Sequence, residues 1–409
     1  MRSFDIPEFY RSPIITQVKA QRKARDPRKQ DFSPTLLDFG GVRIQLARHF
    51  GFCFGVENAI EISYKAISEN PGKRIFLLSQ MIHNPEVNDD LQSRGVRFLQ
   101  DTSGVPLVSM DALTAEDVVI VPAFGTTVEM AALLEAKGVD VQSYNTTCPF
   151  VEKVWKRSSQ LGSEDFTIII HGKPTHEETR ATFSHASTSG HALVVKDGEE
   201  AEFLAQWMVS RQGGVDAFWE VFTGRASSGF DPALHLNRVG VVNQTTMLAS
   251  DTQAIADRIA AAVRARGQGE FANTRDTLCY ATNDNQSATM GALEAGGADV
   301  ALVVGGYNSS NTSHLVELCE ARVPTYFIRN ELEWREDGLH HFDIHTERMN
   351  LTPSPLPSHG MAEVPTVLIT SGASCPDASV ERVLRKVLAH YGSEHAVDAV
   401  LTEFGRVQA

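Results

Sequence analysis

The stretch VRIQLARHFGFCFGVENAIEISYKAI, residues 42–67, changes its apolar spacing halfway along its length. Its first residues form a short apolar run of the kind that a buried strand contains, and from Val56 onward apolar side chains recur at the spacing of an amphipathic helix. Cys53 stands between two glycines at the point of change. The stretch therefore predicts a strand and then a helix, with a cysteine in the loop that connects them.

The same alternation recurs along the rest of the chain. Apolar runs at 117–124, 238–246 and 299–306 are each followed by a helical pattern. This alternation predicts an α/β fold with largely parallel sheets, because parallel strands need a crossover connection and a helix usually supplies it. Residues from about 199 to 238 fit no strand–helix unit and are predicted to be an insertion, and residues 351–365 are a Pro-rich connector.

The composition narrows the classes of function. The 37 basic and 51 acidic residues give a net charge of −14, which argues against broad binding to nucleic acids or anionic membranes, since both need surplus Lys and Arg. No run approaches the roughly 18 apolar residues of a membrane span, and the N-terminus lacks the apolar core of a secretory signal. A cytoplasmic globular protein is therefore predicted.

Residues 1–40 differ from the rest in carrying eight Lys or Arg against five Asp or Glu. Their centre is the basic run KAQRKARDPRKQ, residues 19–30. A transit peptide would be nearly free of acids, whereas Asp5, Glu8 and Asp26 interrupt this segment. We interpret residues 1–40 as an N-terminal surface arm.

Three of the five cysteines share one setting. Cys53, Cys148 and Cys279 each stand where an extended segment ends and a helical one begins. Spacings of 95 and 131 residues exclude a local metal finger, so a shared site requires three separate units to converge. Such loops are where α/β folds build sites, and helix N-termini stabilise thiolates. The other two, Cys319 and Cys375, are predicted to be buried apolar residues.

Three thiolates leave two kinds of metal site open. Zinc with three cysteines normally takes a fourth protein ligand when its site is structural. An iron–sulfur cluster held by three cysteines instead leaves one iron open to substrate. The spacing of the cysteines does not choose between these two alternatives.

Hydroxyl, amide and imidazole groups gather just after several of the predicted strands. Together with nearby glycines and following helices they predict a cradle for a phosphate or diphosphate that is held by neutral donors, since the chain has no GxxxxGK[ST] motif. Each cluster taken alone also fits a helix cap or a turn. The residues are His83, His171, His176, Glu177, Glu178, Thr245, Thr246, Ser309, Ser310, Asn311 and Ser374.

Eight motifs that occur in chain order between about residues 42 and 385 resemble one known family. They are GFCFGVENAI, IHNPEVN, NTTCPFVEKVW, HGKPTHEET, NQTT, CYAT, VVGGYNSSNTSHL and TSGASCPD. The family is the 4-hydroxy-3-methylbut-2-enyl diphosphate reductases of the non-mevalonate isoprenoid pathway. The segment PAFGTTVE and the N-terminal arm are similar to its longer cyanobacterial and plastid branch.

The resemblance implies an iron–sulfur oxidoreductase. Cys53, Cys148 and Cys279 match the ligands of a [4Fe-4S] cluster whose fourth iron binds the substrate hydroxyl. Glu178 matches the carboxylate that delivers protons, and Thr245 matches the residue that orients the hydroxyl. The diphosphate-binding set is matched by His83, His176, Ser309, Ser310, Asn311 and Ser374. Phe124 stands where compact members carry a histidine, and it is given no role.

The implied reaction is reductive removal of the allylic hydroxyl, which yields isopentenyl diphosphate and dimethylallyl diphosphate. We expect Glu178 to have a raised pKa, because burial and nearby negative charge disfavour its ionised form. Ferredoxin or flavodoxin would supply electrons singly, since no GxGxxG motif is present to bind a nicotinamide. Two alternatives stay open at this point: a non-catalytic iron–sulfur redox sensor and, more weakly, a zinc hydrolase.

The resemblance also implies three α/β units around a pseudo-threefold centre that holds the cluster, each unit offering one cysteine. The unit limits then follow from the cysteine positions. We predict an N-terminal arm at 1–40, a first unit at 41–148, a second at 149–278 with the insertion near 199–238, a third at 279–374, and a C-terminal segment at 375–409 that returns to the first unit.

Overall fold

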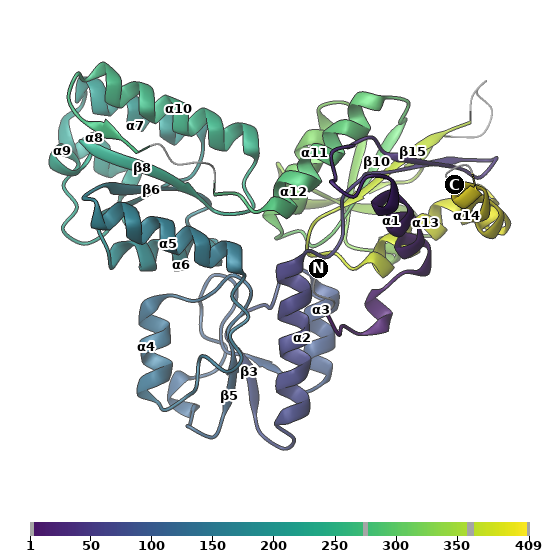
Figure 1. The fold of residues 1–409 in the computed structure, drawn as a ribbon, viewed down its shortest axis with the longest axis horizontal. Coiled ribbons are helices and arrows are strands. Elements are labelled where there is room, and N and C mark those ends of the chain that lie inside the picture. Colours follow the sequence, from purple (N-terminus) through teal and green to yellow (C-terminus); the bar gives the residue numbers. More distant parts are fainter. Residues whose placement is uncertain (1–3, 273–276, 358–363, 407–409) are drawn as a thin grey trace. The chain divides into compact units, whose positions relative to one another are not determined.

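The computed structural model describes residues 4–272, 277–357 and 364–406. The chain divides into two compact units. We call the described parts of Met1–Glu57, His83–Pro85 and Tyr280–Ala409 the terminal unit, and Asn58–Ile82 with Glu86–Cys279 the central unit. Three sheets with helices packed on them make up these units, so the α/β prediction is confirmed (Figure 1).

The terminal unit contains the largest sheet, whose strand order is β1-β2-β15-β10-β11-β13-β12 with β14 paired to β13. The four strands from β2 to β11 run parallel, and the outer strands are antiparallel. Both faces of the parallel strands are covered, which explains why β10 is apolar throughout. The bounds are β1 Thr35–Asp38, β2 Arg43–Leu46, β10 Val300–Val304, β11 Thr325–Ile328, β12 Trp334–Arg335, β13 Gly338–Asp343, β14 Arg348–Thr352 and β15 Thr366–Ser371.

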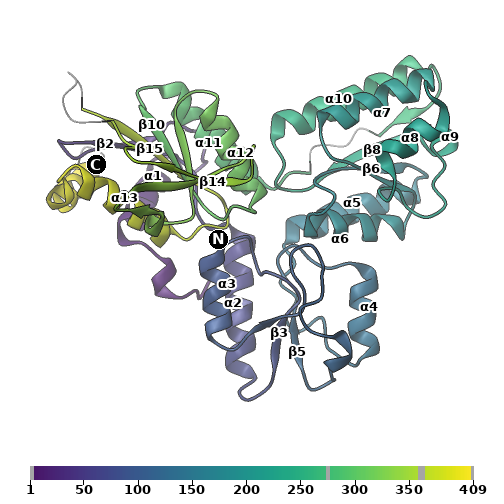
Figure 2. The ribbon, with the colours of Figure 1, turned by 180° about the vertical axis from the view of Figure 1, so that it is seen from behind.

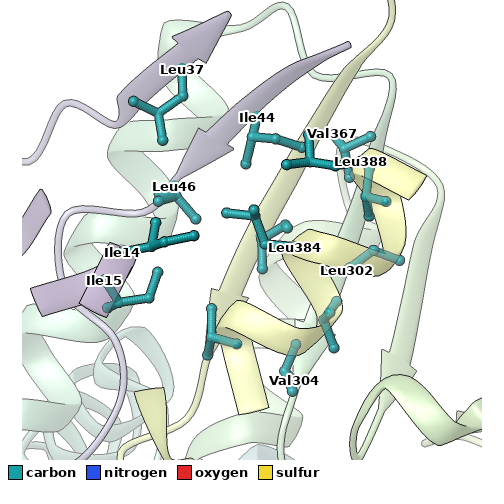
Figure 3. Packing of buried hydrophobic residues seen from close by; sticks show 14 of the residues in the cluster. Ile14, Ile15, Leu37, Ile44, Leu46, Leu302, Val304, Val367, Leu384 and Leu388 are labelled. Carbon is teal, nitrogen blue, oxygen red and sulfur yellow. The ribbon is translucent and has the colours of Figure 1, made fainter. Parts of the chain in front are cut away.

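Helices from both ends of the chain pack in the terminal unit. Ile14 and Ile15 of α1 lie in the same apolar cluster as Leu46 of β2 and Leu384 of α13 (Figure 3). Residues 1–40 are therefore not a surface arm throughout, because α1 buries its apolar face while its charged face stays outside. The helices are α1 Pro13–Arg25, α11 Tyr280–Ala295, α12 Ser310–Glu320, α13 Asp377–His390 and α14 Val397–Arg406, with short η1 Glu8–Tyr10, η3 Glu331–Glu333 and η4 Glu394–Ala396.

The central unit holds two smaller parallel sheets. One has the order β4-β3-β5 and the other β7-β6-β8-β9. Figure 2 shows α5 and α6 on one face of the four-stranded sheet, with α7 and α10 on the other. The strands are β3 Ile75–Leu77, β4 Arg97–Phe98, β5 Val118–Ile120, β6 Thr167–His171, β7 Ala192–Val195, β8 Arg238–Asn243 and β9 Glu270–Phe271.

Helices connect the parallel strands of this unit. They are α2 Phe54–Glu69, α3 Pro85–Ser93, η2 Met110–Ala112, α4 Val128–Ala136, α5 Pro149–Ser163, α6 Glu177–Ser187, α7 Gly198–Ser210, α8 Gly214–Phe222, α9 Pro232–His235 and α10 Ala249–Ala265. The segment predicted as an insertion is helical, and it contributes Trp207, Phe218 and Phe222 to a buried cluster. The predicted limits of the five segments stay a prediction.

Within the described ranges, no helix is both long enough and apolar enough to span a bilayer.

Candidate active site

The loops that follow two neighbouring strands of the central unit leave the sheet at the same end, the C-terminal end of both strands. β6 and β8 are parallel and in register at His171 and Asn243, so the residues that follow each strand emerge together. The loop after β6 leads to His176, which caps α6: its Nδ1 accepts a hydrogen bond of 3.1 Å from the N–H of Glu178. The loop after β8 carries Thr245.

Glu178 is fully buried between these two loops, at 1% exposure. Its Oε1 accepts a hydrogen bond from the N–H of Thr245 at 2.6 Å, and its Oε2 accepts one from the Thr245 hydroxyl at 3.0 Å. Burial raises the pKa of Glu178 to about 7, although both bonds from Thr245 act in the opposite direction. Of the two predicted causes of a raised pKa, burial is the one that acts in the structure, and the carboxyl can hold a proton near neutral pH. Its neighbour Glu177 instead accepts from Ser79.

Two residues that sequence reasoning missed hold this arrangement in place. The Oε1 of Gln244 accepts hydrogen bonds from the Lys173 N–H at 3.1 Å and from the Thr179 hydroxyl at 3.0 Å, which fixes the loop before α6. The Thr277 hydroxyl accepts from the Asn243 N–H at 2.7 Å, which ties the segment before Cys279 to the end of β8. The motif NQTT contained the signal for Gln244, since an amide directly after a buried strand needs partners.

Cys148 and Cys279 reach the same part of the central unit. The N–H of Cys148 donates to the Ala123 carbonyl at 2.9 Å, and the residue caps α5. The N–H of Cys279 donates to the carbonyl of Thr245 at 3.2 Å. The pKa of the Cys148 thiol is raised to about 12, mainly by burial and to a smaller extent by the negative charges that Cys279 and Glu178 would carry, although a backbone hydrogen bond from Phe150 acts in the opposite direction. Such thiols stay protonated unless a metal replaces the proton, so this donor set suits a thiolate-bound metal group.

Cys53 belongs to the terminal unit, in the loop between β2 and α2. Its N–H donates to the Ala373 carbonyl at 3.2 Å, and its own carbonyl accepts from Glu57 at 3.0 Å. Gly51 has a φ of +82°, and a Cβ there would lie 2.1 Å from an oxygen of Asp377, so only glycine fits. Among residues 4–272, 277–357 and 364–406, no three His, Cys, Asp or Glu side chains are arranged to hold one metal ion. The three-cysteine site stays a prediction.

Phe124, which was assigned no role above, contacts a predicted substrate-binding residue. Its ring lies edge-on to the imidazole of His176, with 5.5 Å between the ring centroids and 84° between the planes. This is a favourable geometry for two aromatic rings. Phe124 therefore packs against the cap of α6.

The predicted diphosphate-binding hydroxyls and amide gather in the terminal unit. β10 and β15 are parallel neighbours, paired at Val304 and Ser371. The residues that follow them therefore meet at the C-terminal end of these two strands. Ser309 caps α12 through a bond of 3.3 Å that its Oγ accepts from the Thr312 N–H. Asn311 accepts from the N–H of Ala373 at 2.9 Å. Ser309, Ser310, Asn311 and Ser374 are all buried.

His83 joins this group through its backbone. Its carbonyl accepts a hydrogen bond from the Ser374 hydroxyl at 3.3 Å, and a Cβ on Gly306 would lie 2.2 Å from the same carbonyl oxygen. A glycine is therefore required after β10. Asn285, which sequence reasoning missed, donates to the Asn311 side chain at 3.4 Å. The predicted substrate residues thus divide between the units, with His176, Glu178 and Thr245 in the central one, and their roles stay predictions.

Comparisons with known proteins agree with this picture. A family model described as LytB protein matches residues 44–388. A 4-hydroxy-3-methylbut-2-enyl diphosphate reductase of Parasynechococcus marenigrum (strain WH8102) is 39% identical over 359 residues, with 86% of each chain covered. The enzyme of the same name from Prochlorococcus marinus (strain MIT 9301) is 37% identical over 402 residues, which cover 95% of this chain and 94% of that one.

A solved structure also shares the fold. It is the E-1-hydroxy-2-methyl-but-2-enyl-4-diphosphate reductase from Plasmodium falciparum, with a TM-score of 0.61 and 20% sequence identity over 84% of this chain and 87% of that chain. At this identity the similarity is one of fold alone, and it supports the α/β architecture.

Proposed function

The chain belongs to the LytB family, and we propose that it is a 4-hydroxy-3-methylbut-2-enyl diphosphate reductase, an oxidoreductase that removes the allylic hydroxyl of its substrate to give isopentenyl diphosphate and dimethylallyl diphosphate. The observation that carries this proposal is the buried Glu178, held by Thr245 in the same unit as Cys148 and Cys279. A redox sensor would need the cysteines but not this acid.

The cofactor is a [4Fe-4S] cluster, which Cys53, Cys148 and Cys279 would hold. Cysteine thiolates are the ligands that such clusters take, and Cys148 and Cys279 lie close enough in the central unit for the charge of one to act on the other. When bound, the cluster supplies electrons and an iron that acts as a Lewis acid toward the hydroxyl.

Glu178 provides the proton that the leaving hydroxyl needs. Removal of the hydroxyl as water consumes two electrons and two protons, and hydroxide leaves poorly unless it is protonated. With a pKa of about 7, the carboxyl of Glu178 carries a proton in a large fraction of molecules at neutral pH. The Thr245 hydroxyl bonds Glu178 directly at 3.0 Å, so it can align the acid and the substrate hydroxyl together.

Neutral donors bind the diphosphate. Ser309, Ser310 and Asn311 lie at the N-terminal end of α12, where backbone N–H groups favour an anion, and Ser374 is near them because the N–H of Ala373 donates to Asn311. His83 and His176 complete the predicted set. A protein of net charge −14 thereby holds a highly charged substrate with local dipoles. Ferredoxin or flavodoxin supplies the electrons, and the protein acts in the cytoplasm.

An anaerobic single-turnover experiment tests the proposal. Protein with a reconstituted cluster and a reduced viologen dye should convert the allylic diphosphate into the two products. A visible absorbance typical of iron–sulfur proteins without any product would overturn the reductase assignment in favour of a sensor. A colourless, zinc-loaded protein would contradict the cofactor.

A further inference from the structure

A cavity of about 260 Å³ lies beside Cys53 within the terminal unit. One wall is the loop of residues 50–54, which contains Cys53. Lys19 and Lys23 of α1 line the cavity together with Lys29 and Arg48. The proposed cluster ligand and the basic part of the N-terminal segment therefore share one depression of the surface.

The charge around this cavity is opposite to that of the protein as a whole. Residues 19–29 contain six Lys or Arg and one acid, in a chain with a net charge of −14. Glu57 and Asp284 are the carboxylate residues in the lining. His49 also lines the cavity, but burial and then Arg48 lower its pKa to about 4, so it is neutral. The positive charge comes from Lys and Arg side chains alone.

Of the basic residues in and around this cavity, Lys19, Lys29 and the buried Arg48 are paired, whereas Lys23 and Arg28 are not. Lys19 forms an ion pair with Asp377 at 2.7 Å, and Lys29 forms one with Asp284 at 3.3 Å. Lys23 and the neighbouring Arg28 are exposed and form no ion pair with any described residue. Uncompensated charge thus stands at the surface, which favours a large acidic partner over a small anion enclosed in the cavity.

The basic segment is held firmly against the Cys53 loop. The Lys19 ammonium donates to the Phe50 carbonyl at 2.8 Å, three residues before Cys53. Ile14 and Ile15 of the same helix are buried in the core of the unit (Figure 3). Val18 belongs to the same buried cluster. A partner that binds the exposed face of α1 is therefore placed against the Cys53 loop without any rearrangement of the helix.

We infer that Lys23 and Arg28, which stand beside the ion-paired Lys19 and Lys29, form the docking surface of a small acidic one-electron carrier protein. We call Lys23 and Arg28 the basic rim. The inference rests on the proposed function, since only a redox reaction at Cys53 needs such a partner. Electron-transfer complexes bury little area and form transiently, so a few exposed charges are enough to steer and orient the carrier.

The double variant Lys23→Glu/Arg28→Glu tests the basic rim. The matched control is Lys73→Glu/Arg97→Glu, which makes the same charge change at two exposed residues of the central unit that also lack an ion pair in the described chain. Two quantities are measured at low salt: the Kd for an oxidised plant-type ferredoxin by calorimetry, and turnover driven by reduced ferredoxin or by reduced methyl viologen.

The basic-rim variant should bind ferredoxin roughly tenfold more weakly and lose ferredoxin-driven kcat/KM by a similar factor. Its turnover with methyl viologen should be retained, and the control should match the wild-type protein in every measurement. Unchanged ferredoxin binding would overturn the inference. An equal loss of turnover with methyl viologen would also overturn it. A selective loss of inorganic diphosphate binding would overturn it too, because it would show that the rim binds a small anion.

Failure of the proposed function is distinguishable from failure of this inference. A wild-type protein that gives no product with methyl viologen contradicts the reductase assignment. The calorimetric comparison of ferredoxin binding still decides the role of the basic rim, because it needs no turnover.

Discussion

Two buried carboxylates of the central unit show opposite behaviour. Glu178 accepts hydrogen bonds only from the neutral N–H and hydroxyl of Thr245 among the contacts described above, and burial raises its pKa to about 7. Burial also acts on Asp117, but the Arg74 guanidinium bonds both of its oxygens, at 2.7 and 2.6 Å, and the pKa is held below its ordinary value. Burial therefore raises the pKa of a carboxyl only where no cation compensates its negative charge.

The physical reason is the kind of group that contacts each carboxylate: a cation at Asp117 and neutral donors at Glu178. Removal of a carboxylate from water costs free energy that a fixed cation with good geometry repays and a pair of neutral donors repays in part. Asp117 is therefore an anion that stabilises the three-stranded sheet region. Glu178 is a group that can release a proton near neutral pH.

The largest expected effect comes from removing the acid. Glu178→Gln should keep the volume and the hydrogen bond that Oε1 accepts from the Thr245 N–H, but it should lose roughly 10²- to 10⁴-fold in kcat, the usual contribution of a positioned general acid. Its visible cluster absorbance should be unchanged. Asp117→Asn is the matched control and should retain turnover per folded molecule. A Glu178→Gln enzyme of full activity would remove the proton-delivery role.

The control variant should in turn lose stability. Asp117→Asn removes the anion that Arg74 and the Thr114 N–H hold, so the free energy of unfolding should fall by roughly 1–3 kcal/mol in urea titrations near neutral pH. Because the pKa of Asp117 is lowered in the folded state, this stabilisation is present above the ordinary value of 3.8 and is lost as the pH falls through the folded pKa. A loss of equal size at about pH 3 would contradict the assignment to the charged pair.

The pH dependence of stability should have the opposite sign for Glu178. Its raised pKa means that the folded protein keeps a proton that the unfolded chain releases above the ordinary value of 4.5. Stability therefore falls as the pH rises from about 4.5 to about 7. Glu178→Gln lacks this penalty, so its stability relative to the wild-type protein should rise by roughly 2–3 kcal/mol between about pH 5 and about pH 8. Parallel curves would show that the carboxyl titrates normally.

The smallest expected effect concerns the bond from Thr245 to Glu178. Thr245→Val removes the hydroxyl bond of 3.0 Å but keeps the N–H bond of 2.6 Å. The hydroxyl favours the ionised carboxylate, so its loss should shift the alkaline limb of the pH profile of kcat upward by roughly half a pH unit. Thr246→Val, which removes a hydroxyl that bonds Gln244 instead, should leave that limb in place.

Local patterns predicted much of the fold. The stretch at 42–67 forms β2 and α2 as its spacing indicated, and Cys53 lies in the loop between them. Ser309 caps α12, which is the helix-cap interpretation that its sequence cluster allowed. The charges of residues 1–40 did not predict that this segment is partly buried. The interpretation as a surface arm considered the basic residues and overlooked Ile14, Ile15 and Val18, which form the buried face of α1.

Other features depend on contacts between distant segments. Gln244 bonds Lys173 and Thr179, and Thr277 bonds Asn243, across intervals that no local pattern records. The contact between Phe124 and His176 also joins separate loops.

The sequence by itself determined the alternation of strands and helices and the kinds of chemical group that follow each strand, because both depend on local spacing and residue type. Tertiary structure decided which of those groups meet. The carboxyls of Glu178 and Asp117 have the same chemistry in the sequence, and only the folding of Thr245 against one and Arg74 against the other sets their pKa values in opposite directions. The reason is that solvation and Coulomb interactions depend on distance in space, which the order of residues does not specify.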